Sequence, residues 1–203
     1  QFLYMKPLSL IEFVEGLGER LEDLSHEEAL QKVNDFFLIG GMPAAVEHFK
    51  NSRSFLECSR IQDILLSTYR ADFSKYATEA ERKYLRLVFD AIPTLVGQPL
   101  KYSKIDNQIK SRELKTAIEQ LEWAGLIYPI YATSASGIPL KAQIKQNKTK
   151  PLFLDIGLLQ RSLQVDPDVI RKKDLLEINA GALAEQFVGQ ELLAYSDVFR
   201  EEN

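Results

Sequence analysis

The amino-acid sequence predicts a mainly α-helical chain with a small β-ribbon, organised as a helical bundle followed by a winged helix-turn-helix domain. Three observations lead to this fold class. Apolar residues recur at helical spacing through residues 1–77, and capping signals precede successive helices. Residues 101–155 then hold two short helical patterns and two strand-like runs joined by a long lysine-rich connection.

The predicted bundle contains short helices with recognisable starts and stops. The segments Ser9–Glu12 and Ser25–Glu28 have the residue types and spacing of capping boxes, and each precedes an apolar helical face. The segment Gly40–Pro43 predicts a sharp break, because glycine permits positive φ and proline suits the first turn of the next helix. This segment lacks the lysine and Ser/Thr of a phosphate-binding loop, which favours a corner between helices. A last helical pattern covers residues 55–76.

The predicted winged-helix domain covers residues 78–163. Its first helix begins at a third capping box, Thr78–Glu81, and is expected to be closed by Pro93 and the glycine and proline that follow. Ser111 is placed to cap the central helix, and Gly125 has the position of the residue just beyond its C-terminus.

Two strand-like runs complete this domain. Residues 126–131 and 152–155 are expected to pair as the wing, with the lysine-rich connection between them. Asp155 ends the second run. A functional role is compatible with that position, but an aspartate at the end of a strand more often caps the following helix, and we favour the cap.

Residues 164–203 are predicted to form a polar linker and a final helix, the first of a truncated domain. The apolar side chains expected on one face of this helix are Leu183, Ala184, Phe187, Val188, Leu192 and Leu193. Because the chain begins without methionine inside an apolar run and stops soon after this helix, we expect it to be part of a longer polypeptide.

Composition is that of an ordinary globular protein. Apolar residues make up 45% and charged residues 27% of the 203 residues. No apolar run is long enough to cross a membrane, and the N-terminus lacks the features of a secretory signal. The single cysteine, Cys58, cannot form an internal disulfide, which suits a reducing compartment. We therefore expect a cytoplasmic protein without a membrane partner.

Charge is unevenly distributed along the chain. The formal net charge is −4, but residues 101–150 hold nine Lys and Arg against four Asp and Glu, a local +5 that leaves −9 for the remainder. This pattern is expected when only the basic middle contacts phosphate, although a solvated lysine-rich face would have the same composition. Recognition helices read bases with their N-terminal part, and the central helix is basic there. The candidate nucleic-acid-binding residues, with DNA as the expected partner, are Lys101, Lys104, Lys110, Arg112, Lys115, Lys141, Lys145 and Lys148.

No arrangement of side chains predicts catalysis or metal binding. His26 and His48 are expected at the surface, and two histidines with one distant cysteine are a poor zinc set. No carboxylates pair at a spacing that implies acid–base chemistry, and Glu185 and Glu191 are expected to be solvated. We therefore assign no catalytic residue, metal ligand or cofactor to this chain.

Five phrases in the chain carry a family resemblance. In order, they are residues 6–13 (KPLSLIEF), 40–44 (GGMPA), 69–76 (YRADFSKY), 150–159 (KPLFLDIGLL) and 181–188 (GALAEQFV). Together they resemble the part that follows the nucleotide-binding core in the predicted AAA+-superfamily ATPases of bacteria and archaea, which carry an uncharacterised C-terminal domain. Each phrase alone is weak, but their order spans nearly the whole chain.

The resemblance implies a role for each region. It makes residues 1–77 the tail and helical lid of an AAA+ module, residues 78–163 a winged helix, and residues 180–203 the start of a restriction-endonuclease-like domain with Glu185 on its first helix. Arg70, among the lid helices, would be near nucleotide in the intact protein.

The chain also departs from the family pattern. It has no Gly-x-x-x-x-Gly-Lys-Ser/Thr motif, and the strands that would carry the metal-binding acids of a nuclease-like fold are missing. We therefore expect this chain neither to hydrolyse ATP nor to cut DNA. ATP and Mg²⁺ are expected only in the full-length parent, an ATPase whose N-terminal P-loop domain would be a partner of this chain.

Three functions are compatible with these observations. The first is the non-catalytic C-terminal part of an ATPase, with a winged helix that binds nucleic acid through its local positive charge. The second is a winged helix that serves as a protein-interaction or oligomerisation module, because this fold serves both purposes. Assembly into a homo-oligomer is therefore also compatible with the sequence. The third, a free-standing transcription regulator, is disfavoured because no ligand-sensing domain is apparent.

Overall fold

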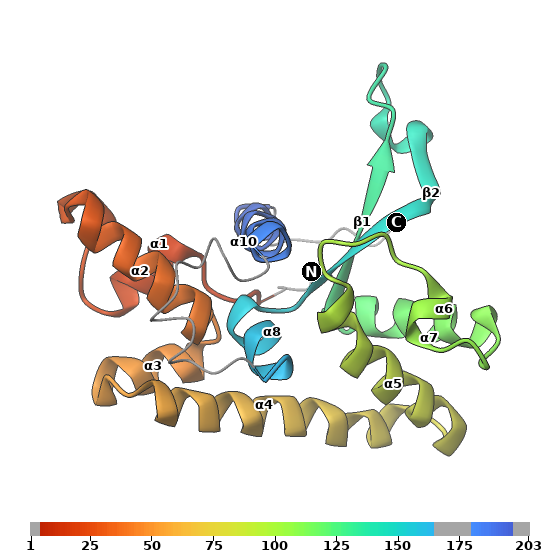
Figure 1. Cartoon of the computed structure of the whole chain (residues 1–203), viewed down its shortest axis with the longest axis horizontal. Coiled ribbons are helices and arrows are strands. Elements are labelled where there is room, and N and C mark those ends of the chain that lie inside the picture. The colour runs from red at the N-terminus through yellow and green to blue at the C-terminus, as the bar shows by residue number, and fades with distance from the viewer. Residues whose placement is uncertain (1–4, 165–179, 197–203) are drawn as a thin grey trace. The chain divides into compact units, whose positions relative to one another are not determined.

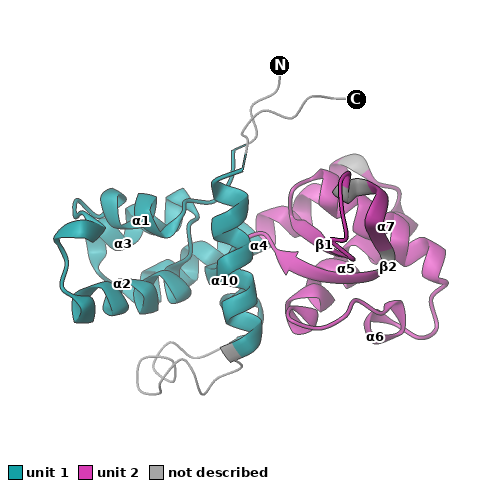
Figure 2. Ribbon diagram, turned by 90° about the horizontal axis from the view of Figure 1, so that it is seen from above, with its two compact units in different colours: residues 1–66, 155–203 teal, residues 67–154 magenta. Residues whose placement is uncertain are grey.

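The computed structural model describes residues 5–164 and 180–196, which are mainly helical and include one small antiparallel sheet (Figure 1). This confirms the predicted class of a mainly helical chain with a β-ribbon. The chain divides into two compact units: unit 1 comprises residues 1–66 and 155–203, and unit 2 comprises residues 67–154 (Figure 2). The predicted linker after residue 164 lies largely outside the described residues.

The two units have boundaries that differ from the predicted ranges 1–77, 78–163 and 164–203. Residues 155–163, predicted to end the winged-helix domain, group with the N-terminal helices. The physical reason is that Ile156 is fully buried in the core of unit 1. Helix α4 (Phe55–Tyr76) contributes residues to both units.

Unit 1 is made of short helices whose starts are set by local chemistry. Its described elements are α1 (Leu10–Gly16), the 3₁₀ turn η1 (Leu21–Asp23), α2 (His26–Ile39), α3 (Pro43–Ser52), the first part of α4, α8 (Ile156–Ser162) and α10 (Ala180–Ala194). The two predicted capping boxes are confirmed: the Ser9 hydroxyl accepts from Glu12 N–H while the Glu12 carboxylate accepts from Ser9 N–H, and Ser25 and Glu28 do the same.

The corner between α2 and α3 requires glycine. Gly40 ends α2 with φ of 76°, in the region that favours glycine, and Pro43 is the first residue of α3, as predicted. A Cβ atom on Gly41 would lie 2.1 Å from the carbonyl oxygen of Leu8. The backbone N–H of Leu8 also donates to the carbonyl oxygen of Gly41 at 2.7 Å. The chain entering α1 therefore packs directly on the backbone of this corner.

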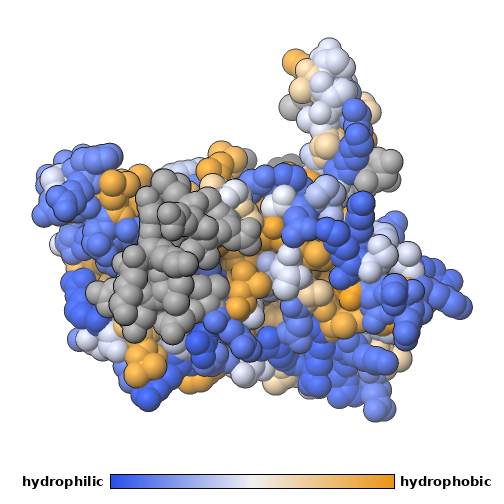
Figure 3. Space-filling view, in the orientation of Figure 1, coloured by the Kyte–Doolittle hydropathy of each residue, from blue (hydrophilic) through white to orange (hydrophobic). Residues whose placement is uncertain are grey.

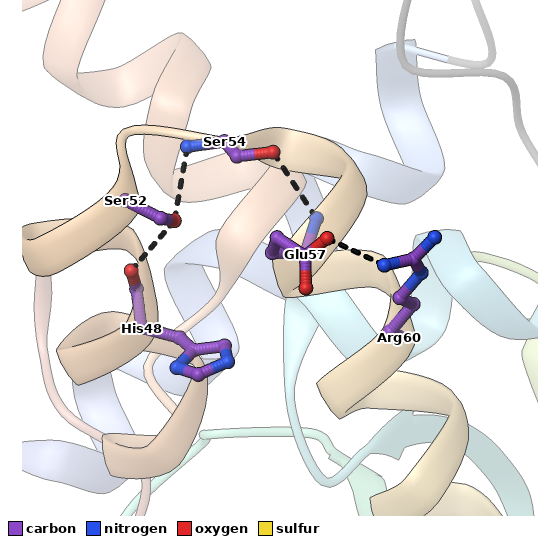
Figure 4. A network of polar contacts seen from close by, with 5 residues as sticks. All are labelled: His48, Ser52, Ser54, Glu57 and Arg60. Atoms are coloured by element: carbon purple, nitrogen blue, oxygen red, sulfur yellow. Dashed lines mark hydrogen bonds and ion pairs between the residues drawn. The ribbon is translucent and has the colours of Figure 1, made fainter.

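A chain of polar contacts shapes the corner between α3 and α4 (Figure 4). The Ser52 hydroxyl donates to His48 O at 2.8 Å and accepts from Ser54 N–H at 3.2 Å. The Ser54 hydroxyl then accepts from Glu57 N–H at 3.3 Å, so it caps the N-terminus of α4. Glu57 also pairs with Arg60 one turn further along.

The core of unit 1 joins helices that are distant in sequence. The ring of Phe36 on α2 meets Phe13 of α1 at a centroid distance of 5.3 Å and Phe187 of α10 at 6.0 Å, both edge to face. Helices α8 and α10 therefore complete the core begun by residues 10–49.

The predicted apolar face of α10 is wrong in part. Leu183 is buried as expected, but Val188 and Leu192 are exposed, and Gln186 and Gln190 are buried instead. Glutamines occupy this inner face because the Gln190 amide has hydrogen-bonding partners on α8, described below.

Unit 2 follows the predicted order of helices and ribbon. Its described elements are the rest of α4, α5 (Glu79–Leu95), α6 (Tyr102–Ile105), α7 (Ser111–Trp123), β1 (Ile127–Thr133), the 3₁₀ turn η2 (Leu140–Gln143) and β2 (Ile144–Phe153). The predicted Thr78–Glu81 capping box begins α5, and Gly125, with φ of 69°, follows α7 as expected.

Two predicted boundaries in unit 2 are wrong. Pro93 lies inside α5, which continues to Leu95, and is buried with the apolar face of that helix. Ser111 is the first residue of α7 rather than its cap, because Lys110 occupies the N-cap position without a side-chain hydrogen bond. The turn before it is held by Asp106, whose carboxylate accepts from Gln108 N–H and Ile109 N–H.

A single antiparallel hairpin forms the described sheet, and its second strand is longer than predicted. The register pairs Ile127 with Phe153 and Tyr131 with Thr149, then shifts so that Ala132 pairs with Lys145. Residues between Lys145 and Thr149 therefore bulge out of the ladder. Lys145, Lys148 and Lys150 lie within β2, not in the connection where they were expected. At its base, Phe153 packs against Phe89 of α5 at 5.2 Å.

Candidate nucleic-acid interface

The predicted basic residues that the structure describes are on the surface of unit 2. The exposed ones are Lys101, Lys104, Lys110, Arg112, Lys115, Lys145 and Lys148. The side chain of Lys141 lies outside the described residues. We call these exposed cations the basic face; they come from three elements: α6 with its N-cap, α7 with its N-cap, and β2.

The exposed cations of α7 lie beside carboxylates. Arg112 approaches Glu113 at 3.1 Å and Lys115 approaches Glu119 at 3.7 Å. The Arg112 side chain is 84% exposed, and ion pairs as exposed as this are worth about 0–1 kcal/mol. A polyanion can therefore replace these carboxylates at little cost in free energy.

Charge at the start of α7 is unfavourable for the helix itself. Lys110 at the N-cap and Arg112 in the first turn face the positive end of the helix dipole, and no side chain caps the helix. Glu113 offsets this only in part. Cations placed there oppose helix stability but add to the attraction that a helix N-terminus has for phosphate.

The hairpin carries positive side chains and no negative ones. Residues 123–154 contain four lysines and no Asp or Glu. Lys145 and Lys148 are exposed, and neither has an ion-pair partner among the residues that the structure describes. The Leu100 N–H donates to Thr149 O at 2.8 Å, which brings the neighbouring Lys101 beside this strand. Sequence reasoning missed that juxtaposition because 48 residues separate the two backbone groups.

Acidic side chains limit the basic face at the other end of α7. Burial raises the pKa of Tyr131 on β1, and the nearby carboxylates of Glu122 and Glu119 raise it further. These carboxylates therefore lie close to the base of the hairpin. The positive charge is therefore concentrated at the N-terminal half of α7 and along β2, not at the C-terminal half of α7.

The tip of the hairpin is organised by one glutamine. The Gln143 side-chain oxygen accepts from Ser136 N–H at 2.8 Å and from the Ser134 hydroxyl at 3.0 Å, and its amide donates to Gly137 O at 2.7 Å. This closed tip leaves Ile138 96% exposed. Hydrophobic atoms are visible among hydrophilic ones at the far end of the hairpin in Figure 3.

Unit 1 contains a buried polar centre at Asp155. Its side chain is fully buried and accepts from Leu158 N–H at 2.9 Å, which confirms the predicted cap of α8. It also accepts from Gly41 N–H at 2.6 Å and from the Gln190 amide at 3.3 Å, while Gln190 accepts from Ile156 N–H at 2.8 Å. Burial raises the pKa of Asp155 to about 6 despite these donors.

The described residues show no metal-binding cluster, and the Cys58 thiol is not activated as a nucleophile. They include no group of three or more His, Cys, Asp or Glu arranged to hold a metal ion, and His26 and His48 are exposed, as predicted. Burial raises the pKa of the Cys58 thiol to about 11, so the reactive thiolate is scarce at neutral pH. No helix in residues 5–164 and 180–196 has the length and apolar content to span a membrane.

Comparisons with known proteins identify a family for most of the chain. A family model described as "Domain of unknown function (DUF8612)" matches residues 30–169, which include the whole of unit 2 and helices α3, α4 and α8. Neither the curated proteins nor the solved structures contain a match. The matched segment covers more than two thirds of the 203 residues, and the chain therefore belongs to the DUF8612 family.

Proposed function

We propose that unit 2 is a winged helix-turn-helix module that binds duplex DNA through its phosphates, using the hairpin and the N-terminal half of α7. The observation that carries this proposal is the composition of the hairpin, which exposes Lys145 and Lys148 without a carboxylate anywhere in residues 123–154. An ordinary solvated face intersperses both signs of charge, whereas phosphate recognition requires one sign.

The order of elements supports the winged-helix assignment. Helices α5, α6 and α7 precede the hairpin, and the short α6 is joined to α7 by a turn that Asp106 stabilises. In a helix-turn-helix the second helix of the pair enters the major groove with its N-terminal residues. In this assignment α7 is that helix, and the hairpin is the wing.

The wider setting of the proposal is an AAA+ ATPase. The resemblance noted in the sequence makes residues 1–77 the tail and helical lid of such a module, and this lid would couple ATP turnover to the DNA-binding unit. The test is the full-length gene product. A Gly-x-x-x-x-Gly-Lys-Ser/Thr motif upstream of residue 1, with DNA-stimulated ATP hydrolysis, supports this setting, whereas a product without the motif contradicts it.

Fluorescence anisotropy of a labelled duplex, at several salt concentrations, tests DNA binding. We expect Lys145→Ala with Lys148→Ala to lower the salt dependence, the slope of log K against log salt, by about 1 for each phosphate contact removed. The matched control is Lys83→Ala with Arg86→Ala, which removes the same charge from exposed positions on α5. Equal losses in the two double variants would indicate a general effect of charge and would contradict a hairpin site.

Exposed apolar residues in unit 2 favour a second candidate function, protein interaction. Trp123 is 78% exposed at the end of α7 and Ile138 is 96% exposed at the hairpin tip. Such side chains gain free energy when a partner protein buries them. Replacing Arg112 and Lys115 with Ala discriminates between the candidates: lost DNA binding with unchanged partner assembly supports the first, and the reverse supports the second.

A further inference from the structure

The two units carry opposite charge. Unit 2 has 14 Lys and Arg against 8 Asp and Glu, a net +6, and unit 1 has 11 against 21, a net −10; together they give the −4 of the chain. Oppositely charged surfaces on one chain attract between copies as well as within a copy, and that attraction weakens with salt.

Helix α10 exposes an apolar stripe on unit 1. Its members are Val188 and Leu192 on the helix and Tyr195 just after it, which are 53%, 68% and 64% exposed and lie on one helical face. We call these three residues the α10 stripe. Apolar side chains gathered in this way on a surface indicate a contact site.

Helix α10 is already held within unit 1, by Gln190 on the face opposite the α10 stripe and by Glu191 at the edge of the stripe. Gln190 bonds to Asp155 and Ile156, and the Glu191 carboxylate accepts from Leu10 N–H at 2.8 Å. Lys6 Nζ donates to Leu193 O at 2.6 Å. These contacts hold the helix with the α10 stripe facing outward.

The described part of α10 and the residues just after it carry only negative charge. Residues 180–196 contain Glu185 and Glu191 and no Lys or Arg. Burial raises the pKa of Glu191, and the nearby Glu12 carboxylate raises it further, so two acidic groups lie close together here. Among the described residues, Lys6 is a cation at the end of this helix, and its Nζ already donates to Leu193 O and Ser196 Oγ. Nucleic acid and anionic lipid, both negatively charged, are therefore disfavoured as occupants.

The basic hairpin of unit 2 has the complementary character. Along with Lys145 and Lys148 it exposes Ile130, Ile138 and Ile144, which are 46%, 96% and 39% exposed. It therefore presents apolar side chains flanked by positive charge, as the α10 stripe presents apolar side chains flanked by negative charge. We propose that this protein associates with a second copy of itself, in which the α10 stripe of one copy receives the basic hairpin of the other.

Such a contact is head to tail. When two copies bind in this way, one copy keeps a free α10 stripe and the other keeps a free hairpin. Association therefore continues until a ring closes or the concentration of protein limits it. Sedimentation velocity of the full chain over a range of protein concentrations measures this. We expect species larger than a monomer at about 50 mM salt and fewer of them at about 500 mM, because the Debye length falls about threefold between these conditions.

Two variants and one matched control locate the interface. Leu192→Glu and Lys145→Glu each alter an exposed side chain, and we expect each to weaken association by about tenfold or more. Leu56→Glu makes the same change at a residue of α4 that is 64% exposed, and we expect it to associate like the wild type. Combining Lys145→Glu with Glu185→Lys should restore part of the association. Circular dichroism confirms that each variant is folded.

The outcomes separate this inference from DNA binding. A wild-type chain that stays monomeric at every concentration at low salt overturns the inference, as does a Leu192→Glu variant that associates like the wild type. Because sedimentation is measured without DNA, a chain that associates but does not bind DNA contradicts only the proposed function. A monomeric chain that binds DNA contradicts only the association.

Discussion

At the scale of single residues, Asp155 holds together three segments that are distant in sequence. Its carboxylate caps α8, accepts from Gly41 N–H at the corner after α2, and meets Gln190 of α10. A buried carboxylate is stable only when donors surround it, and here the N–H groups of Leu158, Gly41 and Gln190 are among them. The same burial raises its folded-state pKa to about 6, above the ordinary value near 3.8.

Asp155→Asn tests this arrangement through pH. An amide cannot accept at every position that the carboxylate occupies, so we expect a loss of about 1–3 kcal/mol in the free energy of unfolding at neutral pH. Because the folded state binds this proton more tightly than the unfolded state, the stability contributed by Asp155 is largest at low pH. It is lost as pH rises from about 4 to about 6, and amounts to about 3 kcal/mol.

Urea denaturation of the wild type and the variant at several pH values measures this effect, since the other carboxylates titrate alike in both. We expect the difference between the two proteins to grow as pH falls from about 7 to about 4. A difference that shrinks over that range would show that the hydrogen-bond donors outweigh burial in setting the pKa of Asp155.

At the scale of elements, α8 approaches α2 through a glycine. A Cβ atom on Gly157 would lie 2.4 Å from the carbonyl oxygen of Ile39 and 2.6 Å from Gly40 N, both of them backbone atoms. Backbone cannot move aside as a flexible side chain does. The contact between the C-terminus of α2 and the first turn of α8 therefore depends on the absence of a side chain at this position.

Gly157→Ala should therefore destabilise unit 1 by about 1–3 kcal/mol or more, because the two helices must separate to admit the methyl group. The matched control is Gly181→Ala in the first turn of α10, where the added Cβ would meet no described atom within 4 Å beyond its chain neighbours and its own helix backbone. We expect that change to be neutral or to stabilise by up to about 1 kcal/mol. Thermal unfolding of both variants checks the pair; equal effects would contradict the close approach.

Elements were predictable from the sequence where their signals are local. The capping boxes at Ser9, Ser25 and Thr78 each lie within four consecutive residues, and the structure contains all three. The buried face of α10 was not predictable, because Gln190 is buried by partners about 35 residues away and hydropathy alone assigns it to solvent. Local periodicity likewise could not show the bulge that places Lys148 within β2.

The candidate basic face was predictable only in its composition. The charge count pointed to residues 101–150, and the structure exposes the cations of that range that it describes, except Lys150, which is half-buried. The charge count could not show which lysines have carboxylate neighbours, since the Lys115–Glu119 contact depends on the rotation of α7. Nor could it show that Lys101 lies beside β2, which depends on a backbone hydrogen bond between distant segments.

At the scale of the whole molecule, the opposite charges of the units set how the chain meets a polyanion. In the proposed function, the +6 of unit 2 favours DNA binding and the −10 of unit 1 opposes it. Unit 2 is also continuous in sequence, with its own buried core that includes Phe89, Leu121 and Phe153. Unit 1 is discontinuous: residues 1–66 form its core only together with residues such as Ile156 and Phe187.

These facts predict different behaviour for the two excised segments. Residues 67–154 should fold alone and unfold cooperatively, because their core is contained within the segment, whereas residues 1–66 should not.

The folded segment should also bind duplex DNA more tightly than the full chain at low salt, since removing unit 1, with its net charge of −10, removes long-range repulsion. The difference should vanish as salt shortens the Debye length. Circular dichroism on heating and anisotropy titrations at several salt concentrations measure both effects. A difference in affinity that persists at high salt would indicate a direct contact of unit 1 with DNA instead of repulsion through solvent.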